Sequence, residues 1–183
     1  VGSGKTVVAA ACAVLAWQNG WQAALMAPTE LLARQHADGL TALLGPLGLR
    51  VGLLTGSLGA AQKRTVRQAL ADGALDLVVG THALLSDPVA FRRLGLVVTD
   101  EQHRFGVAQR AALAGKGGAL RPHVLVMSAT PIPRTLALML YGDLDLSILD
   151  ERPPGRQPVR TFLIGEDKRQ RMYGFVRKQT AEG

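Results

Sequence analysis

Short apolar runs alternate with longer stretches in which apolar residues recur every three or four positions. The short runs predict strands, because they are rich in Val, Leu and Ala and are bounded by turn residues. The longer stretches predict amphipathic helices. We predict strands over residues 23–27, 50–54, 75–79, 96–99, 124–127 and 147–149. We predict helices over residues 6–18, 30–44, 60–71, 107–114 and 134–140.

The strand candidates are apolar on both of their faces, as in Leu96-Val97-Val98. This pattern is typical of a parallel sheet that helices cover on both sides. Glycines follow several of the predicted helices, at Gly20, Gly73 and Gly115, where a left-handed residue ends a helix well. The fold class is therefore α/β, doubly wound, with a mostly parallel sheet.

The alternation breaks at residues 150–158, which contain three prolines and a glycine. Such a segment holds neither a helix nor an inner strand, so we interpret it as an interdomain linker. A strand over residues 159–164 and a basic helix from about Glu166 follow it. We therefore predict a first domain over residues 1–149 and the start of a second over residues 159–183.

Composition adds less than the pattern does. The chain has 183 residues, a formal net charge of +7 and eight Lys or Arg against four Asp or Glu after residue 150. This surplus suits a nucleic-acid partner, but a soluble protein that is merely basic explains it equally well. Cys12 is the single cysteine and stands in an apolar stretch, so we expect its side chain to be buried. A single cysteine forms no disulfide within the chain, which fits a reducing compartment. No run is long enough to span a bilayer, and no signal peptide is visible.

The first candidate site is the sequence V-G-S-G-K-T at residues 1–6, the end of the phosphate-binding pattern G-x-x-x-x-G-K-[ST]. The glycines allow a tight turn whose N–H groups point at phosphate oxygens. Lys5 can reach the β- and γ-phosphates, and the Thr6 hydroxyl can ligate Mg²⁺. A chance glycine turn is the alternative, but the helix directly behind favours nucleotide binding. The predicted nucleotide-binding residues are Gly2, Ser3, Gly4, Lys5 and Thr6.

The second candidate site is acidic and closes a buried strand at Asp100 and Glu101. Asp100 can hold Mg²⁺ through water, and Glu101 then lies close enough to orient and deprotonate the attacking water. Alone, the pair could be a surface feature that ends a strand. A P-loop small-molecule kinase or a GTPase would explain the two sites, but not the Gln102-His103 that follows. We predict Glu101, Lys5 and Asp100 as the catalytic residues.

At this point the sequence resembles the superfamily 2 helicases, and most closely the RecG family of bacterial ATP-dependent DNA helicases. The resemblance runs from residue 1 to about residue 161 in the family's motif order. The matching segments are A-P-T-E-L-L-A-R-Q-H (27–36), L-T-G-S (54–57), G-T-H-A-L-L (80–85), D-E-Q-H-R-F-G-V (100–107), S-A-T-P-I-P-R-T-L (128–136), Y-G-D-L-D (141–145) and P-P-G-R (153–156).

Two other functions stay open beside this one. The motor of a transcription-repair coupling factor shares most of these motif sequences. It typically has Glu where Gln102 stands, and it lacks the segments that match residues 141–145 and 153–156. A non-catalytic DNA- or protein-binding module could keep the fold. Such a module has no use for Lys5, Thr6, Asp100 and Glu101 together.

The resemblance implies a RecA-like P-loop NTPase domain that uses ATP and Mg²⁺ and remodels branched DNA in recombination and repair. It implies a cytoplasmic bacterial protein whose other partners are a second motor domain and an N-terminal wedge domain. By itself, the chain should be inactive. His103, Ser128 and Thr130 would contact or sense the nucleotide. The residues implied to contact the DNA backbone are Thr29, Arg34, Thr55, Gly56, Thr81 and His82.

These last residues also have a simpler interpretation as caps and turns, and Thr29 in particular suits the N-cap of a helix. Hydroxyls, backbone N–H groups and one Arg after strands suit phosphate contacts that do not distinguish bases. His36 and His123 we interpret as structural.

Overall fold

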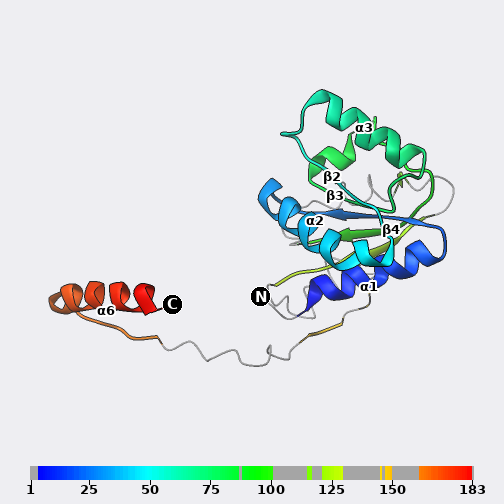
Figure 1. Ribbon diagram of the computed structural model, residues 1–183. Coiled ribbons are helices and arrows are strands. Elements are labelled where there is room, and N and C mark those ends of the chain that lie inside the picture. The colour runs from blue at the N-terminus through cyan, green and yellow to red at the C-terminus, as the bar shows by residue number, and fades with distance from the viewer. Residues whose placement is uncertain are drawn as a thin grey trace. The chain divides into compact units, whose positions relative to one another are not determined.

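The computed structural model describes residues 4–86, 88–100, 115–116, 121–129, 145, 147–149 and 161–182. The chain divides into two compact units, Val1–Glu151 and Arg152–Gly183. The first unit contains the sheet, and the second contains the helix α6 (Figure 1).

The first unit is built on a parallel sheet of five strands in the order β2-β3-β1-β4-β5. Ala23 of β1 lies opposite Leu77 of β3 and Leu96 of β4, so β1 is central and buried along its whole length. The strands β2 and β3 lie on one side of β1, and β4 and β5 lie on the other, as in a doubly wound sheet. The strands are β1 (Gln22–Met26), β2 (Val51–Leu54), β3 (Leu77–Gly80), β4 (Leu94–Thr99) and β5 (His123–Val126).

Helices cover both faces of this sheet (Figure 1). On one face α1 and α2 pack over Leu25, Val79 and Val98 in one core cluster. On the other face Leu70 of α3 joins Ala24, Val78 and Val97 in a second cluster. The α-helices of this unit are α1 (Lys5–Gln18), α2 (Glu30–Leu44) and α3 (Ala60–Ala71), with the 3₁₀ helices η1 (Gly45–Leu47) and η2 (His82–Leu85). The predicted α/β class with helices on both faces is confirmed.

Small residues bring α1 close to the sheet. Ala9, Ala10 and Ala13 are its buried residues, and their spacing puts them on one side of the helix. The helix ends at Gln18 with Asn19 as its C-cap, and the left-handed Gly20 (φ 73°) turns the chain into β1. Because this turn is short, α1 runs antiparallel to β1. Its N-terminus therefore lies at the carboxyl end of the sheet.

The sequence placed most elements within three residues of their observed bounds, but three details of the first unit are wrong. Residues 147–149 form no strand, and their side chains are exposed. Gly115 does not adopt a positive φ, whereas Gly20 and Gly73 do. Cys12 is half-buried rather than buried. The helices predicted over residues 107–114 and 134–140 lie outside the described residues.

The second unit holds the short 3₁₀ helix η4 (Glu166–Lys168) and α6 (Arg169–Glu182), which confirms the helix predicted from Glu166. The strand predicted over residues 159–164 is absent from its described part, 161–164, which is exposed and without regular structure. The described part of this unit offers it no neighbouring strand for pairing. Across the described ranges of both units, no helix combines the length and apolarity that a bilayer crossing requires.

Candidate active site

The start of α1 has the backbone that the phosphate-loop prediction requires. Gly4 precedes the helix with φ 83° and ψ 8°, a left-handed conformation that favours glycine. Its carbonyl accepts hydrogen bonds from the N–H groups of Val7 (3.0 Å) and Val8 (3.3 Å). No side-chain cap satisfies the first turn at this position. Lys5 and Thr6 are the first two residues of the helix, whereas Gly2 and Ser3 lie outside the described residues.

The acidic motif follows β4 at the same end of the sheet. The backbone N–H of Asp100 donates to the Met26 carbonyl at 2.9 Å, which continues the β1–β4 pairing by one residue. Asp100 is 8% exposed. Leu96 and Val98 of β4 pack in the same cluster as α1, so the two-residue period places Asp100 on the α1 face. Glu101 and His103 lie outside the described residues.

This arrangement passes a simple test for Mg²⁺ with a phosphate. Mg²⁺ prefers oxygen ligands, and the Asp100 carboxylate and Thr6 hydroxyl supply oxygen atoms. Both residues belong to one face and one end of the sheet, where the N-terminus of α1 also favours an anion. Both were predicted as metal ligands from the sequence, and those roles stay predictions.

Asp100 has a partner that the sequence did not predict. Nε2 of His36, in α2, lies 2.7 Å from Oδ2 of Asp100, and the two side chains are 13% and 12% exposed. A signal for this contact was available in the sequence. His36 lies three residues after Ala33 and four before Leu40, both buried on the apolar side of α2. A polar side chain on that side needs a partner, which here is the acidic motif.

The sensing residues of the prediction lie after β5. The N–H of Met127 donates to the Thr99 carbonyl at 2.9 Å, so the chain stays beside β4 up to Ser128. Ser128 is half-buried, and Thr130 lies outside the described residues. Ser128 therefore follows directly after the stretch that pairs with the Asp100 strand, and its role toward the nucleotide stays a prediction.

The predicted DNA-contacting residues after β1 and β2 meet around Ser57. The Ser57 N–H donates to Oε1 of Glu30 at 2.9 Å, and Nη2 of Arg34 donates to the Ser57 hydroxyl at 3.4 Å. The hydroxyl of Thr55 lies 3.3 Å from that of Ser57. Hydrogen bonding with the Ser57 side chain, and to a lesser extent with its backbone N–H, holds the pKa of Glu30 below its usual value, against the opposing effect of desolvation. The sequence missed Glu30 and Ser57 as members of this cluster.

Exposure separates these residues into two kinds. Arg34, Gly56 and His82 are exposed, whereas Thr55 is fully buried and Thr81 is 8% exposed. The Thr29 hydroxyl accepts a hydrogen bond from the Leu32 N–H at 3.3 Å, which confirms its interpretation as the N-cap of α2. DNA contacts by all of these residues stay predictions.

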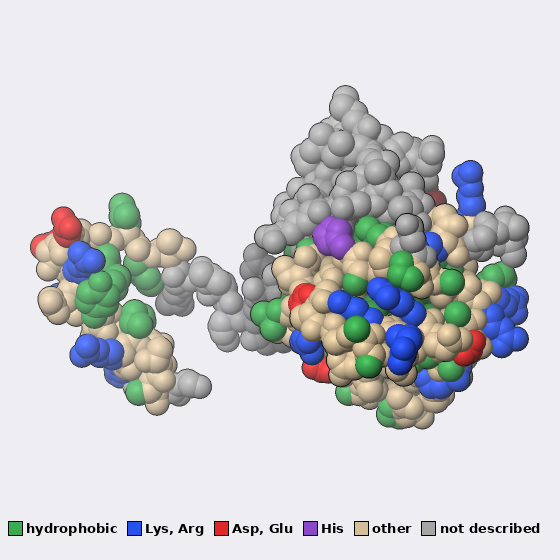
Figure 2. All heavy atoms as spheres, turned by 90° about the horizontal axis from the view of Figure 1, so that it is seen from above, with side chains coloured by type: hydrophobic (Ala, Val, Ile, Leu, Met, Phe, Trp, Pro, Cys, Tyr) green, Lys and Arg blue, Asp and Glu red, His purple; other side chains and the backbone are tan. Residues whose placement is uncertain are grey.

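Basic side chains extend the surface beside this cluster. Nζ of Lys63, in α3, donates to the Gly56 carbonyl at 2.6 Å. The same helix contains Arg64 and Arg67 and has no acidic residue. Figure 2 looks onto the α3 side of the first unit, where Lys and Arg side chains gather.

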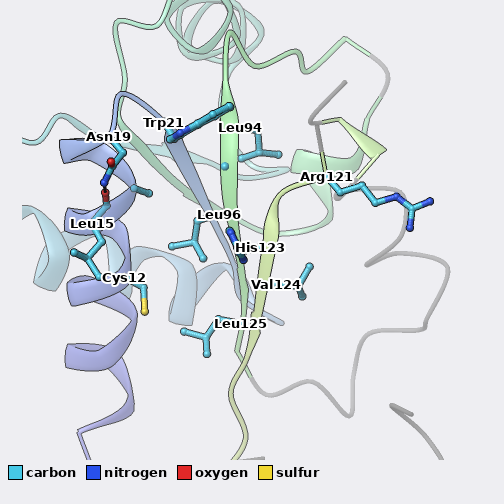
Figure 3. Close-up of a pocket in the computed structure, with 12 residues that line it drawn as sticks. Cys12, Leu15, Asn19, Trp21, Leu94, Leu96, Arg121, His123, Val124 and Leu125 are labelled. Carbon is cyan, nitrogen blue, oxygen red and sulfur yellow. Dashed lines mark hydrogen bonds between the residues drawn. The ribbon is translucent and has the colours of Figure 1, made fainter. Parts of the chain in front are cut away.

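An apolar cavity of about 660 Å³ lies elsewhere in the first unit. It opens between α1 and the starts of β4 and β5, with Leu15, Leu94 and Val124 in its lining (Figure 3). Asp100 follows the opposite end of β4, so this cavity is distinct from the candidate nucleotide site.

Comparisons with known proteins agree with these features. The sequence model of the DEAD/DEAH box helicase family matches residues 1–139. The chain is 57% identical over its whole length to the ATP-dependent DNA helicase RecG of Synechocystis and covers 22% of that protein. It is 51% identical over its whole length to the RecG helicase of Aquifex aeolicus and covers 23% of that protein.

A solved structure of RecG bound to a three-way DNA junction is also similar to the chain. The TM-score is 0.83 at 43% identity, and the match covers the whole of this chain and 24% of the other. The chain thus spans about a quarter of the length of these relatives.

Proposed function

The chain belongs to the DEAD/DEAH box helicase family, and from that premise we propose that it is the nucleotide-binding part of an ATP-driven DNA helicase. The observation that carries this proposal is the convergence of α1, with Lys5 and Thr6 in its first turn, and Asp100 on one face and one end of the sheet. The identity of 57% and 51% to RecG helicases supports the same reaction class.

Each nucleotide-site residue has a role that its chemistry allows. The backbone of Gly2, Ser3 and Gly4 and the ammonium of Lys5 bind the phosphates. Thr6 and Asp100 hold Mg²⁺, which when bound neutralises charge on the phosphates. Glu101 accepts a proton from the attacking water. We assign His103, Ser128 and Thr130 to detection of the γ-phosphate.

The DNA surface that we propose lies around the loops after β1, β2 and β3. Arg34, Gly56 and His82 are exposed there, and α3 adds positive charge beside Gly56. Buried Thr55 and Thr81 would act through their backbone and by shaping the loops. Such contacts bind phosphates and do not distinguish bases. The substrate we propose is branched DNA in recombination and repair, since a RecG relative has been solved on a three-way junction.

The proposed domain organisation follows from the same premise. We propose residues 1–149 as the first motor domain, 150–158 as a linker and 159–183 as the start of the second motor domain. The division of the chain after Glu151 supports this arrangement. The second motor domain and a wedge domain are then partners within the complete protein.

The decisive experiment replaces Lys5 with Ala in the complete protein. Loss of the ammonium from the phosphates should remove DNA-stimulated ATP hydrolysis and most of the ATP affinity, because it removes stabilisation of the developing charge. Lys168→Ala is the matched control, since Lys168 is an exposed lysine of the second unit. Near-normal DNA-stimulated ATPase in Lys5→Ala would refute the proposed function.

A further inference from the structure

We infer that His36 is a positioning residue for the metal site: it fixes the Asp100 carboxylate from α2, the helix whose N-terminus belongs to the proposed DNA surface. The inference rests on the proposed function, because it concerns the Mg²⁺ that Asp100 would bind. It adds a residue that the acidic motif and the phosphate loop do not contain.

The geometry is that of a strong hydrogen bond. Nε2 of His36 and Oδ2 of Asp100 are 2.7 Å apart. A carboxylate only accepts, so Nε2 carries the proton and donates it. Both side chains are almost buried, at 13% and 12% exposure, where water competes little for the two atoms. A charge-assisted bond of this length in such surroundings is stronger than a neutral one.

The bond constrains the group that matters for the ion. Held at Oδ2, the carboxylate has a fixed rotation about its Cβ–Cγ bond, which sets the direction of both oxygen atoms. Partners of this kind orient the ligands of metal sites, and their removal typically costs 10–100-fold in metal affinity or activity. His36 should therefore affect the Mg²⁺ requirement more than the affinity for nucleotide alone.

The donor His36 belongs to α2, the helix that also contacts the Ser57 loop of the proposed DNA surface. His36 lies seven residues after Thr29, the N-cap of α2, a distance of about 10 Å along a helix. The first two turns of that helix are tied to the loop after β2, because Glu30 and Arg34 both bond to Ser57. The position of α2 therefore sets both the Ser57 loop and the donor to Asp100.

The test compares three variants of the complete protein. His36→Leu keeps an apolar side chain of similar volume and removes the donor. His36→Gln keeps an N–H donor at a similar distance from the backbone. His123→Leu is the matched control, because His123 is an exposed histidine at the start of β5, at the other end of the sheet.

Two readouts are needed, and neither is simple turnover. The first is the Mg²⁺ concentration that half-saturates ATP hydrolysis. The second is the affinity for Mn²⁺ in the presence of a non-hydrolysable ATP analogue, measured by electron paramagnetic resonance. In His36→Leu we expect the half-saturating Mg²⁺ concentration to rise and the Mn²⁺ affinity to fall, each by about 10–100-fold. Nucleotide binding in the absence of metal should be unchanged. His36→Gln should recover most of the loss, and His123→Leu should match the wild type.

Unchanged metal affinity in a folded His36→Leu would overturn the inference. Equal losses of metal affinity in the Leu and Gln variants would also overturn it, because a merely structural role does not depend on whether the side chain donates a hydrogen bond. If His36→Leu does not fold, His36→Asn replaces it, because its amide is too short to reach Oδ2. Loss of ATPase in Lys5→Ala with normal metal affinity in His36→Leu rejects this inference alone. Full ATPase in Lys5→Ala rejects the proposed function.

Discussion

The two groups of loops at the carboxyl end of the sheet are held together in different ways. After β1 and β2, exposed polar residues bond to each other around Ser57, and α3 adds a bond to Gly56. After β4, the nearly buried Asp100 accepts a hydrogen bond from His36 in α2. The first group is a locally assembled surface, whereas the second is a carboxylate aimed by a helix.

This difference predicts different kinds of sensitivity. Changes around Asp100 should alter rate and metal requirement steeply, because the reaction needs an exact charge at one point. Changes around Ser57 should alter DNA affinity in small steps, because many backbone contacts share the binding energy. The α2 helix is common to both groups and connects them.

The largest expected effect tests whether these two groups suffice. Under the proposed function, residues 1–183 would supply one wall of a cleft, and we expect an opposing motor domain to supply an arginine to the γ-phosphate. Such an arginine is worth about 10³–10⁵ in rate. ATP hydrolysis by the isolated chain should therefore be slower than in the complete protein by about that factor, and strand separation should be absent.

The measurement combines ATPase with and without branched DNA, strand separation and thermal melting. Melting distinguishes an inactive fold from an unfolded chain. A cooperative melt together with robust DNA-stimulated turnover would show that the two groups of loops are self-sufficient, and the proposed role of the second domain would be wrong.

The next effect separates the two carboxylates of the acidic motif. Glu101→Gln should leave ATP binding intact and slow hydrolysis by about 10²–10⁴, the usual worth of a positioned base. Asp100→Asn should instead weaken Mg²⁺-dependent nucleotide binding. Single-turnover hydrolysis over a range of Mg²⁺ concentrations checks both expectations. Identical defects at saturating Mg²⁺ would contradict the assigned roles.

The fold was largely predictable because its elements have strong local signals. The bounds of α2 and α3 are those predicted, since caps, turns and apolar periodicity agree there. Residues 147–149 were misjudged because two adjacent apolar residues, Ile148 and Leu149, are as compatible with an exposed segment as with a strand. A strand is defined by its neighbours, and the sequence does not name those neighbours.

The family resemblance predicted from the motifs is confirmed. One residue type carries the chemistry at Lys5 and at Asp100, so the sequence could propose roles for both, and those roles stay predictions. The contacts of His36 with Asp100 and of Glu30 with Ser57 were missed. Each joins residues 27 or more positions apart, so only the packing of α2 against the sheet brings them together.

A moderate effect is expected at the DNA surface. Arg34→Ala should weaken DNA binding several-fold and reduce the slope of log affinity against log salt by about 1, as for one lost phosphate contact. Binding assays at several salt concentrations measure both. The loss should be equal on unrelated sequences with the same branch structure.

The control for this prediction is Arg92→Ala. Arg92 is an exposed arginine before β4, at the amino end of the sheet, and it bonds to the Asp72 carbonyl. It should leave the salt slope unchanged. A loss in Arg34→Ala that varies strongly with base sequence would argue against backbone recognition.

The smallest effect concerns the bond that holds the Ser57 loop to α2. Hydrogen bonds with the side chain and then the backbone N–H of Ser57 lower the pKa of Glu30, so the ionised form is favoured by the folded loop. A lowered pKa means that the bond is complete above the usual pKa of Glu and is lost only as the pH falls through the lowered value. At neutral pH the loop should therefore be fully bonded, and Glu30→Gln, which keeps an oxygen acceptor, should change DNA affinity by roughly twofold at most.

Selective ¹⁵N-serine labelling can follow the Ser57 amide resonance during an acid titration. Its shift should have a midpoint below that of an ordinary Glu, and the titration should disappear in Glu30→Gln. A midpoint at the ordinary value would mean that the bond does not persist in solution. The loop after β2 would then not be locally assembled, and the contrast with the helix-aimed Asp100 would fail.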